Sequence, residues 1–258
     1  MQPHRPRKRF GQHFLIDERT IDRLVAAVAV RPGERLLEIG PGEGVLTRPL
    51  LIAGGQVTAI ELDRDLASTL PRRLGEPAGL TVIQGDVLKA DLAAIGGGRP
   101  LRVVGNLPYN ISTPILFRLF DQLRLITDMH FMLQKEVVDR MVAAPGGRDY
   151  GRLSVMAGFF CEMEWLFDVP ASAFRPPPKV VSAIIRLKPK ALNVDDLALL
   201  PNLDRLVRQA FSQRRKTLRN ALKGLLDADQ IRAVDVDPGL RPEKLSLNDY
   251  LRLAATTE

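Results

Sequence analysis

The sequence predicts an α/β protein in which a mostly parallel sheet carries helices on both faces and a small helical domain follows. Short apolar runs of strand length alternate with stretches of helical periodicity, which is typical of such sheets. The runs lie near residues 35–39, 56–60, 80–84, 101–105 and 128–133. Beyond Lys188-Pro189-Lys190 the chain becomes helical and basic, without further alternation. We therefore expect two domains, residues 1–190 and residues 191–258.

Helical spacing and apolar runs extend the prediction to both ends of the first domain. Apolar residues at positions 21, 24, 25 and 28 fall on one helical face, so we expect a helix over residues 21–30. Residues 164–167 and 180–187 are of strand length and are separated by a proline-rich segment. We expect two late strands joined by a loop there.

Length and composition limit the possible classes of protein. With 258 residues, 45% of them hydrophobic, the chain can bury the core of one large domain or of one domain plus a small one. The formal net charge of +7 and the pI of about 9.8 suit a polyanionic partner. A basic surface without such a partner is the alternative, and net charge says nothing about the fold.

Cysteine and histidine usage argues against disulfides and metal sites. Cys161 is the single cysteine, and His4, His13 and His130 lie far apart in the sequence. This pattern offers no intramolecular disulfide and no zinc-type spacing, so we expect no metal. No apolar run is long enough to cross a bilayer, and the N-terminus lacks the apolar segment of a secretory signal. We expect a cytoplasmic protein without a membrane partner.

A glycine-rich loop follows the first predicted strand. Gly40, Gly42 and Gly44 lie between this strand and a helix that opens at residues 45–47, as in a nucleotide-binding α/β unit. Their spacing is not the G-x-G-x-x-G of NAD or FAD proteins, and no Gly-Lys-Ser/Thr of a P-loop follows. Such glycines let the backbone approach a ligand closely, whereas a tight turn is the alternative.

Acidic residues stand at the ends of the next two predicted strands. Glu61 lies 21 residues after Gly40, the spacing at which a carboxylate accepts from ribose hydroxyls. Asp86 ends the third strand, where it can accept from the exocyclic amine of an adenine. Either acid alone is more often a helix N-cap or a solvated charge. Ligand-type residues at consecutive strand ends favour one shared site, because ligands bind at the carboxyl ends of parallel strands.

The segment Asn106-Leu107-Pro108-Tyr109 comes directly after the fourth predicted strand. The Asn106 amide oxygen and the Leu107 carbonyl can accept hydrogen bonds from the amine of a flat base. Pro108 restricts the backbone that aims these acceptors, and Tyr109 can stack on the base. An ordinary turn is the alternative, since Asn and Pro are turn formers.

Several motifs resemble those of known families. Residues 38–44 resemble the first motif of S-adenosylmethionine-dependent methyltransferases, and residues 106–109 resemble the motif of enzymes that methylate adenine N6. The chain is similar to the bacterial small-subunit ribosomal RNA adenine dimethyltransferases from about Phe10 to about Tyr250. Four further segments carry this similarity: Arg9-Phe10-Gly11-Gln12-His13-Phe14-Leu15, Asn110-Ile111-Ser112-Thr113-Pro114, Phe174-Arg175-Pro176-Pro177-Pro178-Lys179-Val180 and Phe211-Ser212-Gln213-Arg214-Arg215-Lys216-Thr217-Leu218.

The resemblance implies a Rossmann-like methyltransferase sheet whose late strands pair antiparallel at its edge, with S-adenosylmethionine as cofactor. It implies that two adjacent adenosines near the 3′ end of small-subunit (16S) ribosomal RNA become N6,N6-dimethyladenosine during biogenesis of the small subunit. His13 and Leu15 would lie at the edge of the cofactor and Gly40 against its methionine part. Glu61 would hold the ribose, Asp86 the adenine, and Asn106 would lie near the reacting end.

The chemistry of adenine gives the predicted residues their roles. N6 is a poor nucleophile because its lone pair is delocalised into the ring. Acceptors on Asn106 and Leu107 would favour a tetrahedral nitrogen, and stabilising that developing geometry speeds the reaction. The base must leave its stack, and we expect Tyr109 and Phe174 to sandwich it. Phe174 has an alternative role as a core aromatic ahead of a proline turn.

Two basic clusters are candidates for RNA binding. No acid interrupts the C-terminal cluster, for which we expect phosphate contacts from Arg214, Arg215, Lys216 and Arg219. Leu206, Ala210, Leu218, Leu222 and Leu225 would form its apolar packing face. A solvated basic helix is the alternative. The N-terminal cluster is either a flexible arm or an arm that orders over substrate; it consists of Arg5, Arg7, Lys8 and Arg9.

Three other functions remain compatible with these motifs. A methyltransferase of large-subunit ribosomal RNA, of the type that confers macrolide resistance, would share them all. A DNA adenine methyltransferase is disfavoured, because its motif reads Asp-Pro-Pro-Tyr. A binding protein that checks ribosome assembly, with methylation secondary, uses similar basic surfaces. We expect small-subunit ribosomal RNA or an immature 30S subunit as partner, and a monomeric protein.

Overall fold

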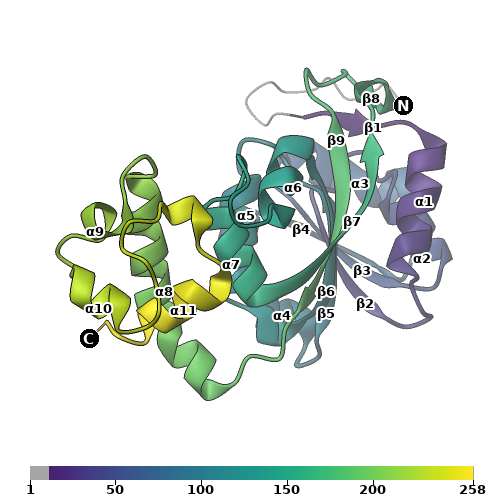
Figure 1. Ribbon diagram of the computed structural model, residues 1–258. Coiled ribbons are helices and arrows are strands. Elements are labelled where there is room, and N and C mark those ends of the chain that lie inside the picture. Colours follow the sequence, from purple (N-terminus) through teal and green to yellow (C-terminus); the bar gives the residue numbers. More distant parts are fainter. Residues whose placement is uncertain (1–11, 258) are drawn as a thin grey trace. The chain divides into compact units, whose positions relative to one another are not determined.

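The computed structural model describes residues 12–257 and contains two compact units (Figure 1). The first unit runs up to Val138 and includes Glu164–Pro189, whereas the second holds Asp139–Met163 and the chain from Lys190 onward. The predicted division at residue 190 differs from this one, because Asp139–Met163 belongs with the C-terminal helices. That grouping rests on long-range helix packing, which no local pattern in the sequence reveals.

The first unit is built on a seven-stranded sheet. In sheet order its strands are β4 (Leu80–Gln84), β3 (Gln56–Glu61), β2 (Arg35–Ile39), β5 (Leu101–Asn106), β6 (Ile126–Gln134), β9 (Ser182–Pro189) and β7 (Cys161–Val169). The strands from β4 to β6 are parallel, and β9 runs antiparallel to β6. A separate antiparallel pair joins β1 (Phe14–Leu15) to β8 (Phe174–Arg175).

The five strands predicted from the apolar runs are confirmed, and so is the mostly parallel sheet. Both late strands are present as well: β9 lies antiparallel beside β6, and β7 forms the edge of the sheet next to β9. The β1–β8 pair was not predicted. Each of its strands has only two residues, too few to show any periodicity.

Central strands of the sheet are buried on both sides. Leu36 and Leu37 on β2, and Val103 and Val104 on β5, have no exposed surface. Since successive side chains of a strand point to opposite faces, helices must cover both faces of the sheet. On one face Leu36 and Val104 pack in a cluster with Leu24 of the first helix. This two-sided burial explains why the strands appear in the sequence as continuous apolar runs.

Eleven α-helices occur between residues 12 and 257, and none of them is both long and apolar enough to span a membrane. They are α1 (Glu18–Val28), α2 (Thr47–Ile52), α3 (Arg64–Leu74), α4 (Leu92–Gly96), α5 (Ser112–Phe120), α6 (Lys135–Val142), α7 (Arg152–Phe160), α8 (Val194–Ser212), α9 (Leu218–Ala221), α10 (Ala228–Arg232) and α11 (Leu247–Ala254). The helix predicted over residues 21–30 begins earlier, because the Asp17 carboxylate caps it by accepting from the Thr20 amide at 2.8 Å.

The second unit is helical, as predicted for the C-terminal segment. In it α7, α8 and α11 pack against one another. Tyr250 of α11 is fully buried, and its hydroxyl donates to the Pro242 carbonyl at 2.9 Å. Four of the five residues predicted to form the apolar face are buried: Leu206, Ala210, Leu218 and Leu222. The fifth, Leu225, is half-buried.

An ion pair joins β5 to β6 at the end of the sheet remote from the glycine loop. The Arg102 guanidinium donates to both carboxylate oxygens of Asp128 at 2.8 Å, and Glu34 accepts from it at 3.0 Å. Burial acts to raise the pKa of Asp128, but the hydrogen bonds from Arg102 hold it below its usual value. His130 lies two residues further along β6 and has no exposed surface.

We predict that His130 makes folding pH-dependent. Burial lowers the pKa of His130 from 6.5 to about 4, although the nearby Asp128 carboxylate and a backbone contact with Ala27 act in the opposite direction. The unfolded chain therefore binds this proton more readily, so stability should fall as the pH drops from about 6.5 towards 4. Between pH 7 and pH 5 the loss should be about 2 kcal/mol.

Urea denaturation at these two pH values measures the effect. A His130→Phe variant keeps an aromatic ring of similar size but cannot titrate. Its loss of stability between pH 7 and pH 5 should therefore be smaller than that of the wild type by about 2 kcal/mol. Equal pH dependence in the two proteins would contradict the assignment to His130.

Candidate functional site

Two adjoining cavities form one cleft at the carboxyl ends of β2, β3, β4 and β5. Both are lined by Gly40, Glu61 and Pro108, and about 790 and 640 Å³ of space, part of it open to solvent, lies between their walls. The cleft lies where β3 and β5 flank β2 on opposite sides, which is the topological switch point of the sheet. All of its lining residues belong to the first unit.

The glycine loop after β2 forms one wall of the cleft. Gly40, Gly42 and Gly44 have φ angles of 68°, 58° and 84°, a conformation that other residues rarely adopt. A Cβ on Gly42 would lie 3.1 Å from the ring of Phe14, so a side chain there would also crowd β1. The loop can therefore present its backbone to a ligand at close range, as the sequence predicted.

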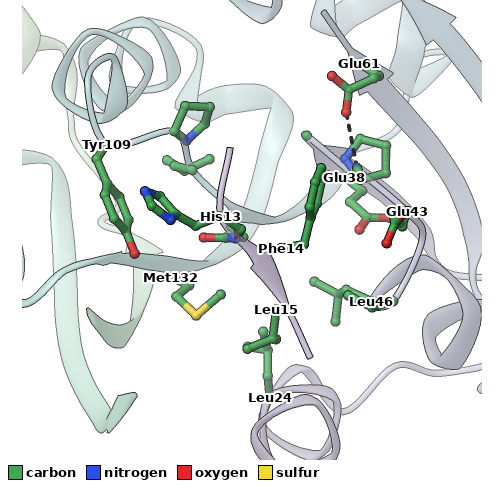
Figure 2. Close-up of a pocket in the computed structure, with 17 residues that line it drawn as sticks. His13, Phe14, Leu15, Leu24, Glu38, Glu43, Leu46, Glu61, Tyr109 and Met132 are labelled. Atoms are coloured by element: carbon green, nitrogen blue, oxygen red, sulfur yellow. Dashed lines mark hydrogen bonds between the residues drawn. The ribbon is translucent and has the colours of Figure 1, made fainter. Parts of the chain in front are cut away.

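Glu61 ends β3 and supports the glycine loop. One carboxylate oxygen accepts from the Gly42 amide at 3.1 Å, as Figure 2 shows, and the other accepts from the Asp63 amide at 2.9 Å. Burial raises the pKa of Glu61, whereas these two backbone donors lower it. A carboxylate has about four acceptor positions, so two bonds leave room for ligand hydroxyls.

Asp86 follows β4 and lines the second cavity. One of its carboxylate oxygens accepts from the Leu88 amide at 3.0 Å and caps the short helix Val87–Lys89. The cap that the sequence offered as the alternative therefore exists. It does not conflict with ligand binding, because the same carboxylate borders a cavity whose other walls include Ile111 and Ile115.

The first cavity contains two acidic residues that the sequence did not single out. Glu38, on β2, is 2% exposed, and its Oε2 atom has no hydrogen-bond partner among residues 12–257. Burial raises the pKa of Glu38 to about 7; the nearby Thr47 hydroxyl opposes this effect, and the charge of Glu61 adds to it. Glu43, in the glycine loop, pairs with Arg73 at 2.9 Å. With Glu61, these carboxylates make the cavity favourable for a cationic ligand.

The burial of Glu38 was not visible in the sequence. An acid next to a glycine loop is usually solvated, and only its position within a central strand, flanked by Leu37 and Ile39, hinted at burial.

Asn106 and Leu107 stand at the end of β5, beside the glycine loop. The Asn106 amide nitrogen donates to the His13 carbonyl at 3.0 Å, which leaves its amide oxygen available as an acceptor. The Leu107 amide donates to the Met132 carbonyl of β6 at 3.1 Å, so its backbone is held to the sheet. Pro108 lines both cavities. The structure thus brings together the acceptors that the sequence predicted.

Tyr109 is half-buried and is held at both of its ends. Its ring stacks on the imidazole of His13, with centroids 5.6 Å apart and planes 22° from parallel (Figure 2). The His13 Nδ1 atom lies 2.7 Å from the Pro176 carbonyl, and the Tyr109 hydroxyl lies 2.6 Å from that of Ser182. Burial raises the pKa of Tyr109, so the phenol is neutral near pH 7.

Phe174 does not line the cleft, in contrast to its predicted role on one face of the base. It is 2% exposed and packs in the core cluster with Leu24 and Val169. The antiparallel pairing of β8 with β1, which sets Phe174 opposite Leu15, places it there. The structure corresponds to the alternative interpretation, a core aromatic ahead of a proline turn. Leu15 itself lines the first cavity, as does His13.

The predicted phosphate-binding residues differ in their surroundings within the second unit. The Arg214 guanidinium donates to the carbonyls of Gly147 and Arg148 at 3.3 and 2.5 Å. Arg215, Lys216 and Arg219 are exposed, and their side chains form no ion pair with the described part of the chain. The N-terminal cluster Arg5, Arg7, Lys8 and Arg9 lies outside the described residues.

The cleft fits S-adenosylmethionine, the cofactor implied by the sequence motifs. The unpartnered Glu38 oxygen suits a positive charge of this sulfonium and ammonium compound. The glycine loop, whose positive φ angles disfavour side chains, suits close approach of the ligand. Glu61 and Asp86 lie at neighbouring strand ends, which suits a ribose joined to a purine.

Comparison with known proteins gives a consistent result along the whole chain. The sequence model described as ribosomal RNA adenine dimethylase matches residues 3–258. The Ribosomal RNA small subunit methyltransferase A of Methylococcus capsulatus is 57% identical over 251 residues, 97% of each chain. The protein of the same name from Pseudomonas aeruginosa is 54% identical over 252 residues, 97% of this chain and 94% of its own.

Two solved structures are similar over most of their length. A dimethyladenosine transferase from Plasmodium falciparum has a TM-score of 0.79 at 28% identity, covering 93% of this chain and 96% of its own. The 23S rRNA methyltransferase ErmE has a TM-score of 0.72 at 29% identity, covering 95% and 99%.

We predict that Glu38 makes the affinity for S-adenosylmethionine pH-dependent. With a pKa of about 7, its carboxyl is neutral in acid and becomes charged as the pH rises through 7. Affinity for this cationic ligand should therefore increase between pH 6 and pH 8, by up to about 1.4 kcal/mol, the tenfold limit that one group with this pKa sets over that range. Calorimetric titration across this range measures the change.

Glu38→Gln should remove most of this increase, whereas Glu162→Gln, on the exposed surface of β7, should keep it. The assignment to Glu38 fails if the wild-type protein and Glu38→Gln show the same rise in affinity.

Proposed function

Because the chain belongs to the ribosomal RNA adenine dimethylase family, we propose that it dimethylates N6 of two adjacent adenosines near the 3′ end of small-subunit (16S) ribosomal RNA. Membership of the family makes it an S-adenosylmethionine-dependent ribosomal RNA adenine dimethyltransferase, and the resemblance found in the sequence is confirmed. The choice of the small subunit is supported by the names of relatives that are 54–57% identical. The observation that carries the proposal is the placement of Asn106 to Tyr109 beside a carboxylate-lined cleft.

In this proposal the residues at the strand ends would hold the cofactor. Asp86, in the second cavity, would accept from the adenine amine, and Glu61 would accept from the ribose hydroxyls. Gly40 and Glu38, in the first cavity, would hold the methionine part, and His13 and Leu15 would line its edge. Bound there, S-adenosylmethionine supplies the electrophilic methyl group.

Asn106 and Leu107 prepare the target nitrogen for attack. The Asn106 amide oxygen and the Leu107 carbonyl accept from the N6 hydrogens, which favours a tetrahedral nitrogen with an available lone pair. Both groups are held to neighbouring elements, Asn106 by the His13 carbonyl and Leu107 by Met132, so little reorganisation is needed. After the first transfer only one N6 hydrogen remains, so the site must then admit a methyl group beside one acceptor.

Tyr109 supplies the surface on which the flipped base stacks. The target adenine must leave its RNA stack to reach the cleft, and base–aromatic stacking offsets part of that cost. In this structure His13 lies against one face of the ring. The base therefore uses the other face or displaces His13. Since Phe174 is buried in the core, we assign it no contact with the base in this arrangement.

RNA binding is assigned to the exposed cations of the second unit. We propose phosphate contacts for Arg215, Lys216 and Arg219. Arg214 is held by two backbone carbonyls, so we assign it mainly to the support of this surface. The partner would be small-subunit ribosomal RNA or an immature 30S subunit in the cytoplasm, and the protein would act as a monomer.

Methylation of RNA in vitro tests the proposed function. Purified protein, labelled S-adenosylmethionine and RNA from each ribosomal subunit should give label in small-subunit RNA only, and mass spectrometry should find two adjacent dimethylated adenosines. Label in large-subunit RNA would favour an activity like that named for ErmE. Duplex DNA offered in a parallel reaction should stay unlabelled, and label in DNA alone would contradict the assignment to RNA.

Asn106→Ala should reduce the rate of methyl transfer much more than it reduces RNA affinity. The acceptor matters most while the nitrogen changes geometry, and loss of one such preorganised group costs about 2.7–4 kcal/mol, or 10²–10³ in rate. Single-turnover kinetics measures the rate, and filter binding measures the affinity. An unchanged single-turnover rate would show that Asn106 has another role.

Charge reversal on the second unit should weaken RNA binding and change its salt dependence. Each phosphate contact contributes about 0.7–0.9 to the slope of log affinity against log salt. Arg215→Glu with Lys216→Glu should therefore flatten the slope by roughly two such contacts. The affinity for S-adenosylmethionine should stay the same. Arg232→Gln, at a guanidinium of α10 that pairs with Asp229, is the control, and its slope should remain near that of the wild type. Equal slopes in all three proteins would leave this cluster as a solvated basic surface.

A further inference from the structure

Ser182 is the first residue of β9, and its side chain has no exposed surface. It pairs with Gln134, the last residue of β6, where β9 joins the central sheet. Water cannot reach a hydroxyl at such a place, so it needs a partner within the protein. That partner is the hydroxyl of Tyr109, at 2.6 Å, a residue that lies 73 positions away in the sequence.

Tyr109 is not part of a strand or a helix. It lies between the end of β5 and the start of α5, so regular backbone hydrogen bonding does not fix the plane of its ring. The bond to Ser182 supplies a second point of attachment. The Cα of Tyr109 lies on the loop after β5, and its hydroxyl is hydrogen-bonded to Ser182 of β9. The residue is therefore attached to two strands that lie on opposite sides of β6.

The orientation of this ring matters for the reaction proposed above. Aromatic stacking depends on the relative angle and offset of the rings, so a ring whose axis swings out of position loses part of its stacking energy. A misplaced base also loses alignment with the methyl donor, and alignment supplies much of the rate. The hydroxyl of Tyr109 lies on the axis of the ring, at the far end from its backbone, so a bond there fixes the direction of that axis, while the stacked imidazole of His13 opposes rotation about it.

We propose that Ser182 is a positioning residue that fixes the direction of the Tyr109 ring axis for the flipped adenine, an inference that rests on the proposed methylation of adenine. It acts through Tyr109 and does not touch the substrate. Its contribution should therefore appear in the rate of methyl transfer and not in the binding of the cofactor, whose lining residues do not include it.

A double-mutant cycle on the full-length protein tests this role. Single-turnover methylation of small-subunit RNA is compared among the wild type, Ser182→Ala, Tyr109→Phe and the double variant. Tyr109→Phe keeps the ring and removes only its hydroxyl. Each single variant should lose about three- to tenfold in rate, the usual scale for a neutral hydrogen bond, and the double variant should lose no more than the worse single one.

Three further measurements separate positioning from general support of the fold. The KM for RNA and the affinity for S-adenosylmethionine should stay near the wild-type values while kcat falls. Ser182→Thr, which keeps a hydroxyl, should recover most of the rate. Ser68→Ala, at an exposed serine of α3, should behave as the wild type. If Ser182→Ala unfolds, Tyr109→Phe and Ser182→Thr still test the same bond.

Two results would overturn the proposal. If the losses of the two single variants multiply in the double variant, the two hydroxyls act independently. If Ser182→Ala is as active as an active wild type, Ser182 has no positioning role, while the proposed function stands. A wild-type protein that transfers no methyl group to adenine would instead overturn the proposed function and this inference together.

Discussion

The close parallel pairing of β2 with β5 is the constraint on which the rest of the site depends. In the register of these strands Ile39 lies opposite Gly105, and a Cβ on Gly105 would come within 2.6 Å of the Ile39 carbonyl. Glycine at this position therefore lets the strands meet. The residues that follow, Gly40 and Asn106, then emerge side by side at the switch point of the sheet. The glycine loop and the adenine-type acceptors are neighbours for this reason, although Gly40 and Asn106 lie 66 positions apart in the sequence.

Charge is distributed unevenly in this protein. The chain is strongly basic, with a formal net charge of +7, yet three carboxylates line its first cavity. The two signs suit the two ligands of the proposed reaction, a polyanionic RNA and a cofactor with a sulfonium centre. Glu38 is the most constrained of these acids, because a central strand encloses it and leaves one of its oxygens unpaired within the described chain. Such a group costs stability in the folded protein unless a ligand or proton satisfies it.

The segment around β1 connects parts of the site that are remote in the sequence. Its pairing with β8 places His13 against Tyr109 and Phe14 against Gly42. The same pairing draws Phe174 into the core. One short antiparallel ladder thus decides which aromatic side chains face the cleft and which support it. Neither strand has enough residues to be stable alone, so tertiary contacts must hold this arrangement.

Much of the fold was predictable from local patterns, and so were the site residues that stand at the ends of strands. The central strands are buried on both faces and appear as apolar runs, and Gly40, Glu61, Asp86 and Asn106 stand directly at their ends. Side chains that follow parallel strands must converge at one edge of the sheet, so these positions follow from the pattern alone. Family motifs then supplied the identity of the cofactor and of the target base.

Other features depended on contacts between distant segments. The burial of Phe174 and the pairing of Tyr109 with Ser182 arise from β8 and β9, which no periodicity relates to the glycine loop. The raised pKa of Glu38 follows from its enclosure and not from its neighbours in sequence. Likewise, Arg214 donates to backbone carbonyls of the loop after α6. In the sequence it stands beside Arg215 in one run of basic residues, so the sequence could not distinguish the two. The sequence alone determined which residue types stand at the strand ends, because periodicity and strand direction are local properties. Only the tertiary structure decided which of them are buried, paired or free to meet a ligand, because burial and pairing depend on segments that come together only when the chain folds.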